Sequence, residues 1–418
     1  MEPQPPRHLR AATPAESGGN RRRIGLIVVV MLALAGGAGV AVAQTTRGRA
    51  QPTNAAASST VPPTTAATTT TVAPPRTATI AFGGDVLIHS PVWKAAATPN
   101  GYDFSPMFAP LSPVLTAADV AICHLEVTLA RPEDPLSSYP RFRAPAALAT
   151  DLAEAGFDGC SVSSNHALDF GPQGVVATLD ALDAAGLQHV GTARTPEENQ
   201  LAARYDAGGI AVAQLSYTYG FNGFTRPAGQ EWLADQIDPA LILRDAAAAR
   251  AAGAEVVIVS LHWGNEYNHD VTTAQQQVAD ALAAVPGAVD LVVGTHAHVV
   301  QPISKVGSMW VVWGMGNLLS SNSTGCCPKD TIDGLVVTVG IGDLGARGAG
   351  AGVTSVAVTP TWNERRTFRV LPTAATVADG TAPDLVADLR ASYARTMSAV
   401  LALGGAEVGV VPVPAMPG

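Results

Sequence analysis

Charged residues, aromatic residues and long hydrophobic runs are all scarce in this sequence. Charged side chains make up 14% of its 418 residues and aromatic ones 5%, whereas an average soluble domain is roughly 25% charged. Only one uninterrupted apolar run reaches 20 residues, at positions 24–43. A single run of that length excludes a polytopic membrane protein, and the rest of the chain is long enough for a sizeable core.

Basic residues are also few beyond the first 76 positions. That segment holds eight of the 25 Lys and Arg residues, so residues 77–418 carry 17 basic and 32 acidic side chains, a net charge of −15. Proteins that bind nucleic acid normally present a basic face. We therefore expect no nucleic-acid partner, and no long-range attraction of an anionic substrate by this body.

The four cysteines are too few for a disulfide scaffold in a chain of this size. Cys326 and Cys327 are adjacent, which hinders a bridge between them. Cys123 and Cys160 lie in apolar runs that suit neighbouring strands. This pair could form a disulfide or remain as two buried thiols, and the sequence leaves both alternatives open. None of the spacings predicts a zinc–thiolate site.

The N-terminal segment predicts export. Three arginines at positions 21–23 directly precede the apolar run, and this bias places the N-terminus inside the cell and the body outside. The run is long enough to cross about 30 Å of hydrocarbon, whereas the apolar part of a cleaved signal is about 7 to 15 residues. We expect a cytoplasmic tail (1–23), a retained transmembrane signal anchor (24–43) and a Thr/Pro/Ala-rich linker (44–76), giving a single-pass cell-membrane protein with an extracytoplasmic body. Secretion after cleavage near Ala43 is the alternative.

From residue 77 onward, short β-branched runs alternate with Ala-rich helical stretches, which is typical of an α/β fold. Most of the runs are too apolar for one face of the strand to be exposed to solvent, so they predict sheets that are covered on both sides. Apolar residues recur at helical spacing in 174–185, 241–252 and 273–284, and 383–403 predicts a closing helix. We expect one catalytic-type domain at 77–405 and a flexible C-terminal tail at 406–418.

Polar side chains stand where the apolar runs end. Five runs end in carboxylate, amide or imidazole groups, and these are Asp85, Glu126, Asn165 with His166, His262, and His296 with His298. Taken singly, each of these residues has a purely structural explanation: it could be a turn residue, a helix cap or a histidine whose hydrogen bonds are all made within the protein. In layered α/β folds, however, the carboxyl ends of strands open onto one crevice where ligands bind. Oxygen and nitrogen donors without a thiolate predict one or two divalent ions such as Mn²⁺, Fe or Zn²⁺.

Seven short blocks follow one another in a specific order: FGGD (82–85), HLE (124–126), FRAP (142–145), SNHALDFG (164–171), HWGNEY (262–267), GTHAHVVQ (294–301) and GMGN (314–317). Together they resemble the CapA family of poly-gamma-glutamate capsule biosynthesis proteins, a branch of the calcineurin-like metallophosphatase superfamily. The resemblance covers most of residues 80–339. It implies a four-layer α/β/β/α sandwich with a metal centre at the strand ends.

Carried over residue by residue, the resemblance implies six metal ligands, namely Asp85, Glu126, Asn165, His262, His296 and His298. Glu126 matches the carboxylate that bridges two ions in the wider superfamily, and His166 matches the histidine that serves phosphate ester cleavage. Two positions depart from the pattern. Leu87 stands where the wider superfamily usually has His, and His124 stands where this family usually has Asn. The first ion site therefore lacks one expected ligand, with His89 or His124 open as a substitute.

Further polar residues are candidates for the same pocket. We expect Asp169 to orient His166 by accepting from its other ring nitrogen, and Arg143 to clamp a phosphate or carboxylate with two hydrogen bonds. An ordinary turn carboxylate and a structural salt bridge are the alternatives for these two residues. The remaining candidates for the pocket lining are Glu266, Tyr267 and Asn317.

Three functions are compatible with these residues, because a fold and a metal site do not fix a reaction. The resemblance implies a protein that helps synthesise, export or attach an anionic envelope polymer of the poly-gamma-glutamate type. The expected anchor would make it a membrane protein, for which a membrane synthase complex is a suitable partner. The second function is a metal-dependent phosphoesterase acting on an envelope phosphate ester. The third is a non-catalytic scaffold that binds the polymer, to which the missing imidazole at position 87 lends weight.

Overall fold

The computed structural model describes residues 74–322, 326–345 and 350–418. The predicted cytoplasmic tail, the predicted anchor and nearly all of the predicted linker lie outside these residues. Within them, no helix is long and apolar enough to cross a bilayer.

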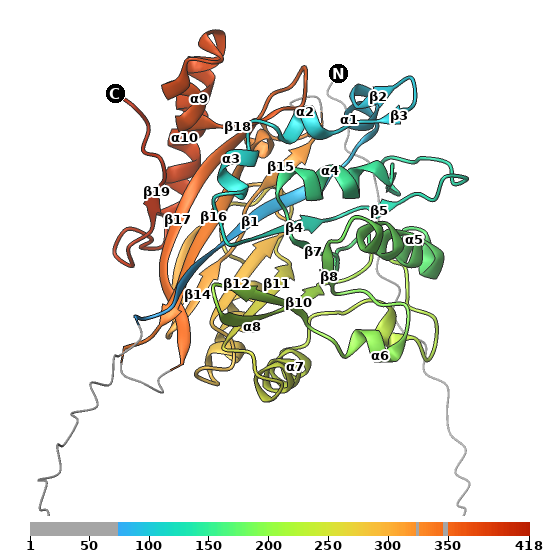
Figure 1. Cartoon of the computed structure of the whole chain (residues 1–418), viewed down its shortest axis with the longest axis vertical. Helices are drawn as coiled ribbons and strands as arrows, with labels where there is room; N and C mark the ends of the chain where they lie inside the picture. Colours follow the sequence, from blue (N-terminus) through green and yellow to red (C-terminus); the bar gives the residue numbers. More distant parts are fainter. Residues whose placement is uncertain (1–73, 323–325, 346–349) are drawn as a thin grey trace, which may run out of the picture. The chain divides into compact units, whose positions relative to one another are not determined.

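Two mixed sheets form the body of the molecule (Figure 1). The larger sheet has the order β18 (Val370–Pro372), β17 (Ala351–Asn363), β16 (Asp333–Asp343), β1 (Thr77–Leu87), β4 (Val120–Leu125), β7 (Gly159–Ser161) and β8 (Gln188–Val190). Two further strands join it: β15 (Asn317–Ser320) beside β1 and β19 (Val411–Pro412) beside β17. The strands β1, β4, β7 and β8 run parallel to one another, so their carboxyl ends meet at one edge.

The smaller sheet has the order β13 (Ile303–Val306), β14 (Met309–Val312), β12 (Leu291–Thr295), β11 (Val256–His262), β10 (Ile210–Thr218) and β9 (Ala203–Ala207). Its four central strands are parallel, and the two outer strands are antiparallel to their neighbours. In each sheet, therefore, the carboxyl ends of several parallel strands lie along one edge.

The alternation of side chains along the strands places the sheets face to face. On β1, Ile80 and Phe82 pack in one core with Ile258 of β11 and Val293 of β12, whereas Ala81 between them faces a second core. This period of two is what a strand buried on both faces requires. The core between the sheets is thus made of β-branched and aromatic side chains from both.

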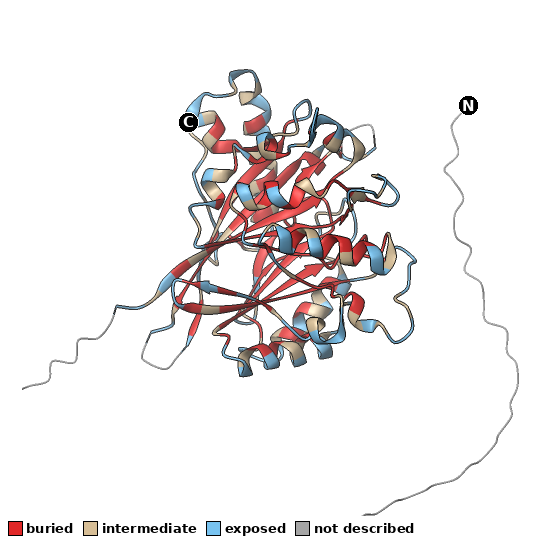
Figure 2. Cartoon of the chain, turned by 45° about the vertical axis from the view of Figure 1, so that its right-hand side comes forward, coloured by how far each residue is buried: buried red, intermediate tan, exposed pale blue. Residues whose placement is uncertain are grey.

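Helices cover the outer faces. The second core packs α4 (Ala147–Ala155) and α5 (Gly171–Ala184) on the larger sheet. A third core packs α7 (Pro239–Ala251) and α8 (Thr273–Ala283) on the smaller one. In Figure 2 the strands are mostly buried and the helices expose one side. The layers therefore run helix, sheet, sheet, helix, and the predicted mixed α/β class is confirmed.

The predicted helices are present with shifted ends. Asp238 caps α7 by accepting from the Ala240 backbone N–H at 2.9 Å, and Thr272 and Gln275 form a capping box at the start of α8. The predicted closing helix is α10 (Val386–Val400), preceded by α9 (Thr373–Asp379). The remaining short helices are α1 (Ser90–Ala95), α2 (Ser105–Phe108), α3 (Ser112–Leu115) and α6 (Pro196–Asn199), and the remaining two-residue strands are β2 (Ala97–Thr98), β3 (Gly101–Tyr102), β5 (Thr128–Leu129) and β6 (Arg143–Ala144).

The C-terminal segment 406–418 differs from the predicted flexible tail. Its strand β19 pairs with β17, and the Val413 backbone N–H donates to the Val358 carbonyl at 2.8 Å. Arg390 of α10 donates to the carbonyl of Pro417 at 2.7 Å. The sequence did not predict this pairing, because a two-residue strand has no pattern of its own and its partner lies about fifty positions earlier in the sequence.

Both cysteine pairs are bridged. Cys123 of β4 is bonded to Cys160 of β7, its direct neighbour in the register of the two parallel strands, which decides between the two readings of this pair. Cys326 is bonded to Cys327, contrary to the expectation that adjacency would hinder it. The adjacent pair lies in a turn, and there the backbone can bring neighbouring side chains to one side.

Candidate metal centre

The six predicted ligands converge where the parallel strands of both sheets end. They are Asp85 on β1, Glu126 after β4, Asn165 after β7, His262 at the end of β11, and His296 and His298 after β12. All six side chains are buried. The strand-end pattern therefore predicted correctly which residues come together, although they span more than 200 positions of the chain.

The Glu126 carboxylate lies at the centre of this cluster. Its Oε1 is 3.8 Å from Nε2 of His262 and 3.7 Å from Nε2 of His298. Neither of its oxygens has a hydrogen-bond partner within the described part of the chain. Burial raises the pKa of Glu126 well above its ordinary value, because an unpaired charge is costly in a low-dielectric interior. A divalent cation satisfies such a carboxylate, so the residues present fit a metal ion.

Among the residues that the structure describes, four sets of three donors have ligand atoms within 4.8 Å of one another. The sets are Asp85, His124 and His262; Glu126, His262 and His296; Glu266, His296 and His298; and Asp85, Glu126 and His298. They overlap through shared members, so they outline one continuous centre. The donors are nitrogen and oxygen throughout, a set that suits Mn, Fe or Zn.

Hydrogen bonds fix how His298 faces the centre. Its Nδ1–H donates to Oδ2 of Asp85 and to Oδ1 of Asn317, both at 3.1 Å, which leaves Nε2 on the side of Glu126. Burial opposes protonation of His298, but the carboxylates of Glu126 and Asp85 outweigh it and raise its pKa to about 9. A bound cation would take the place of this proton.

The other two histidines of the set are held as neutral rings. His262 contacts Thr295 Oγ1 through Nδ1 at 3.1 Å and Asn165 Oδ1 through Nε2 at 3.0 Å. Burial lowers the pKa of His262 well below its ordinary value, and that of His296 to about 3. His296 also has a positive φ of 91°, a conformation that non-glycine residues adopt at a cost and that is often found at functional sites.

His166 lies beside the ligands and is oriented by Asp169, as expected. Its Nδ1 is 2.8 Å from Oδ2 of Asp169, and the same oxygen accepts the backbone N–H of Phe142 at 2.6 Å. Arg141 anchors the segment by donating to the Asp169 carbonyl. Because Asp169 accepts from Nδ1, Nε2 is the nitrogen of His166 that is turned away from Asp169.

The four predicted lining residues have different environments. Glu266 is exposed and shares a donor set with His296 and His298, and the partly exposed Tyr267 ring lies 6.1 Å from that of His298. Asn317 is fully buried and supports His298 instead of facing an open cleft. The guanidinium of Arg143 lies 3.4 Å from the carboxylate of Asp134 and over the ring of Phe170. This contact has the form of the structural salt bridge given as the alternative, and the role of Arg143 as an anion clamp stays a prediction.

The sequence reading missed two residues after β10. The Tyr219 ring lies 4.5 Å from that of His296. Asn222 accepts from Asn165 Nδ2 at 3.4 Å, and its own Nδ2 is 3.5 Å from Nε2 of His166. Both follow a parallel strand of the smaller sheet, so the rule that found the ligands would have found them had it been extended to the run at 210–218.

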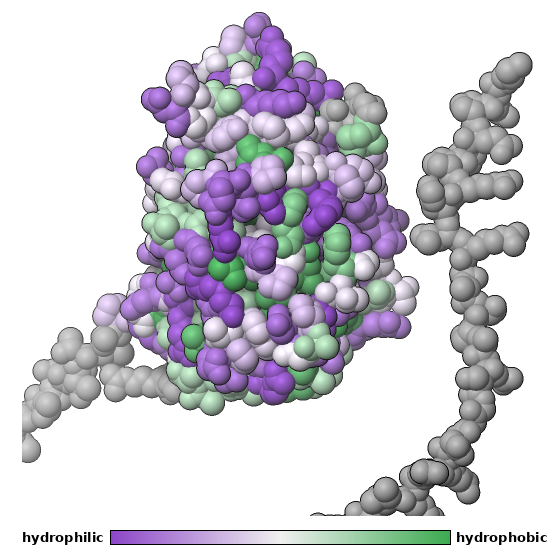
Figure 3. Space-filling view, turned by 90° about the vertical axis from the view of Figure 1, so that its right-hand side faces the viewer, coloured by the Kyte–Doolittle hydropathy of each residue, from purple (hydrophilic) through white to green (hydrophobic). Residues whose placement is uncertain are grey.

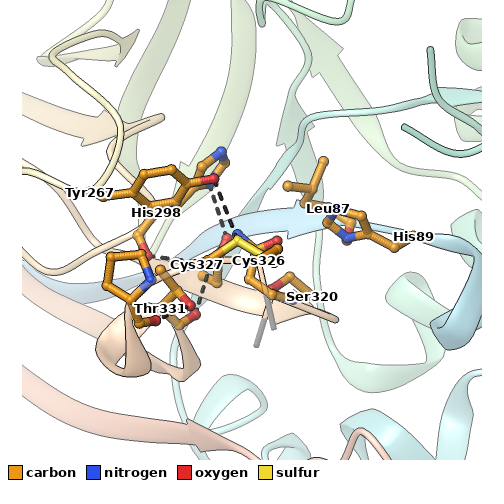
Figure 4. Close-up of a disulfide and its surroundings, with 11 residues drawn as sticks. Leu87, His89, Tyr267, His298, Ser320, Cys326, Cys327 and Thr331 are labelled. Atoms are coloured by element: carbon orange, nitrogen blue, oxygen red, sulfur yellow. Dashed lines mark hydrogen bonds between the residues drawn. A yellow bond between two sulfur atoms is a disulfide. The ribbon is translucent and has the colours of Figure 1, made fainter. Parts of the chain in front are cut away.

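The Cys326–Cys327 disulfide lies near Tyr267 and His298 (Figure 4). The Tyr267 hydroxyl is 3.7 Å from Sγ of Cys327, and Tyr267 in turn packs near His298. Leu87 and His89 are visible in the same view, and His89 Nδ1 donates to the Leu87 carbonyl at 3.1 Å. That bond turns one nitrogen of His89 to the backbone.

Comparison with known families places these residues in context. The model of the family described as "Bacterial capsule synthesis protein PGA_cap" matches residues 79–322. The matched range is more than half of the chain and contains all six predicted ligands.

Similar proteins match over shorter stretches. The "Capsule biosynthesis protein CapA" of Bacillus anthracis is 26% identical over 171 residues, which is 40% of this chain and 41% of that protein. The "PGA biosynthesis protein CapA" of Bacillus subtilis (strain 168) is 27% identical over 175 residues, 40% of this chain and 44% of that protein. The matches thus span less than half the length of these relatives. Among solved structures, the calcineurin-like phosphoesterase YfkN from Bacillus subtilis has a TM-score of 0.43 at 13% identity, covering 69% of this chain and 91% of that one.

Proposed function

Since the chain belongs to the bacterial capsule synthesis protein family, we propose that it helps synthesise, export or attach an anionic envelope polymer of the poly-gamma-glutamate type, by means of a metal-dependent hydrolase-like centre. The names of its relatives in two Bacillus species support the polymer. The buried donor cluster supports the metal dependence.

One observation carries the proposal of a metal centre. The carboxylate of Glu126 is buried, has no hydrogen-bond partner among the described residues and has two imidazole nitrogens within 4 Å. A protein interior rarely holds such a group without a compensating charge. We propose one or two divalent ions, of Mn, Fe or Zn, held by the six ligands at the strand ends.

The chain's own residues supply the rest of the chemistry. A divalent ion bound here would act as a Lewis acid toward a phosphoryl or acyl oxygen. His166 would hold a proton on Nε2 for a leaving oxygen while Asp169 keeps its Nδ1–H bonded. Asn222, 3.5 Å from that Nε2, would position the group that receives the proton.

A second candidate is a phosphoesterase that acts on an envelope phosphate ester. The contact between His166 and Asp169 beside the metal ligands favours it, because a pair oriented in this way serves general acid catalysis. A non-catalytic scaffold would need neither the pair nor the unpartnered carboxylate.

The location also stays a proposal. The apolar run at 24–43 and the arginines before it support a retained membrane anchor with the body outside the cell, where a membrane synthase complex would be its partner. Recovery of the intact N-terminus in the membrane fraction is the expected result. A mature N-terminus near Ala43 in the medium would replace the anchor with a cleaved signal.

Metal analysis of the purified full-length chain tests the centre. We expect one or two ions per chain in the wild type, none in Glu126→Gln, and wild-type content in Glu255→Gln, whose carboxylate pairs with Arg76 away from the cluster. A wild-type chain that retains no Mn, Fe or Zn after reconstitution would overturn the metal centre.

A deletion strain tests the polymer. We expect loss of an anionic envelope polymer that the wild-type gene restores and the Glu126→Gln gene does not. Normal polymer in the deletion strain would refute the capsule role. Hydrolysis of 4-nitrophenyl phosphate or its bis-ester by the wild type, lost in His166→Ala, would favour the phosphoesterase.

A further inference from the structure

His124 is a buried imidazole at the metal centre that the six predicted ligands do not include. It is the direct neighbour of Asp85 in the register of β1 and β4, and in-register neighbours on paired strands project their side chains from the same face. The ring stacks on that of His262 with centroids 4.8 Å apart. His124 is 2% exposed, so no bulk water reaches it.

Hydrogen bonding determines which nitrogen of His124 carries the proton. Nδ1 lies 2.9 Å from Oγ of Ser161, and the Ser161 hydroxyl donates its own proton to the Cys123 carbonyl at 3.3 Å. A hydroxyl whose proton is committed can only accept from Nδ1, so Nδ1 is the protonated nitrogen. Nε2 therefore carries a lone pair, and it has no partner among the residues that the structure describes.

The His124 ring lies close to other donors. Ligand atoms of Asp85, His124 and His262 all lie within 4.8 Å of one another. Two positions after Asp85 on β1 stands the hydrocarbon of Leu87, which offers no ligand atom. A nitrogen on the neighbouring strand is thus the donor available on that side of Asp85.

We propose that His124 is a nitrogen ligand of the ion held at Asp85, and that Ser161 positions it by fixing its tautomer. This inference rests on the proposed metal centre and adds a seventh protein ligand to it. Metal-bound imidazoles usually donate their other N–H to a second group, and the contact between His124 and Ser161 has that form. The Cys123–Cys160 bridge ties β4 to β7 one residue before this pair.

The test compares metal affinity and ligand field in the full-length chain. His124→Asn should weaken Zn²⁺ or Mn²⁺ binding by at least about tenfold. Even the loss of a residue that only hydrogen-bonds to a metal ligand typically lowers metal affinity by about that factor. It should also change the visible absorption of the Co²⁺-substituted protein, because one nitrogen ligand is lost. Ser161→Ala should weaken binding less. His189→Asn, which removes an imidazole bonded to Asp183, should match the wild type.

Unfolding of the metal-free proteins controls for damage to the fold, and His124→Gln replaces His124→Asn if the shorter side chain prevents folding. Unchanged affinity and an unchanged Co²⁺ spectrum in the folded His124 variant would overturn this inference while leaving the metal centre intact. Absence of metal from the wild type would instead overturn the metal centre itself.

Discussion

At the scale of single residues, the proposed proton transfer depends on the contact between His166 and Asp169. We expect His166→Ala to lower kcat for a metal-dependent hydrolysis by roughly 10²- to 10⁴-fold, the usual contribution of a positioned acid. Asp169→Asn should lower kcat less, since the ring stays but its orientation and tautomer are no longer fixed. Steady-state kinetics with an aryl phosphate measures both changes. Metal content should stay at the wild-type level, and its loss in either variant would show that the pair supports the ligands instead.

The unpartnered Glu126 carboxylate predicts opposite effects on metal binding and on stability. Glu126→Gln should abolish the rise in Tm on adding Zn²⁺ or Mn²⁺. In the metal-free protein it should raise the free energy of unfolding at pH 8 by about 1–3 kcal/mol, because the cost of burying the charged carboxylate exceeds its attraction to His298. Burial raises the pKa of Glu126 in the folded state, so the difference should shrink as pH falls and the wild-type carboxyl becomes protonated. A metal-free variant that is less stable than the wild type at pH 8 would contradict this reading.

The sequence marked the six candidate ligands but not the contacts of the residues that support them. Asp85, Glu126 and the histidines follow apolar runs, so a local pattern marks them. The contact between Asn222 and His166 and the burial of Asn317 depend on how two sheets close over each other. No local pattern encodes that closure. This is why the sequence left His124 as one of two possible substitutes and did not predict its contact with Ser161 or the contact of Asn317 with His298.

At the scale of elements, the Cys123–Cys160 bridge joins β4 to β7 beneath the metal centre. It closes a loop with a sequence separation of 37, for which the chain-entropy model gives about 3–4 kcal/mol of stabilisation. Replacing both cysteines with Ala should lower the free energy of unfolding by about this amount and weaken metal binding, since His124 and Ser161 follow the bridged residues. Denaturant unfolding of the metal-free and metal-loaded chain measures both effects.

The adjacent pair Cys326–Cys327 provides the matched control. Its sequence separation is 1, so the bridge closes almost no chain and its removal should leave the free energy of unfolding nearly unchanged. Equal losses for the two double variants would show that the Cys123–Cys160 bridge does not act by constraining the unfolded chain.

Elements with a long pattern were predictable and short ones were not. Repeating apolar positions marked α5, α7 and α8, and runs of β-branched residues marked β1, β11 and β12. The two-residue strand β19 has too few positions for a period. Its place beside β17 is set by a distant partner, which is why the sequence did not predict the pairing of residues 411 and 412.

At the scale of the whole molecule, the small number of charged residues and the extensive burial of the strands have one cause. Two sheets sandwiched between helices need apolar side chains on both faces of most strands, and the remaining polar residues gather at strand ends and on the surface. Figure 3 shows one face on which hydrophilic residues cover most of the surface and hydrophobic ones form small groups. Arg76, predicted as the last linker residue, pairs with Glu255 and Asp343 and so begins the body.

The stability of the whole body should depend on pH through Asp235, outside the metal centre. Its carboxylate accepts from Asn199 Nδ2 at 2.8 Å, yet burial outweighs this bond and raises its pKa to about 7. The folded state therefore retains a proton that the unfolded chain, with a pKa near 3.8, has already released. Stability from this group is fully present below about pH 4 and is lost as pH rises to about 7.

Asp235→Asn mimics the protonated form and removes this dependence. We compare the free energy of unfolding of the variant with that of the wild type. The difference, variant minus wild type, should increase by up to about 1.4 kcal/mol per pH unit as pH rises from 4 to about 7, and should then level off. Because both chains share every other titrating group, the difference isolates Asp235. Denaturant unfolding in chelator at several pH values measures it. A difference that stays flat over this range would mean that Asp235 is already ionised in the folded protein.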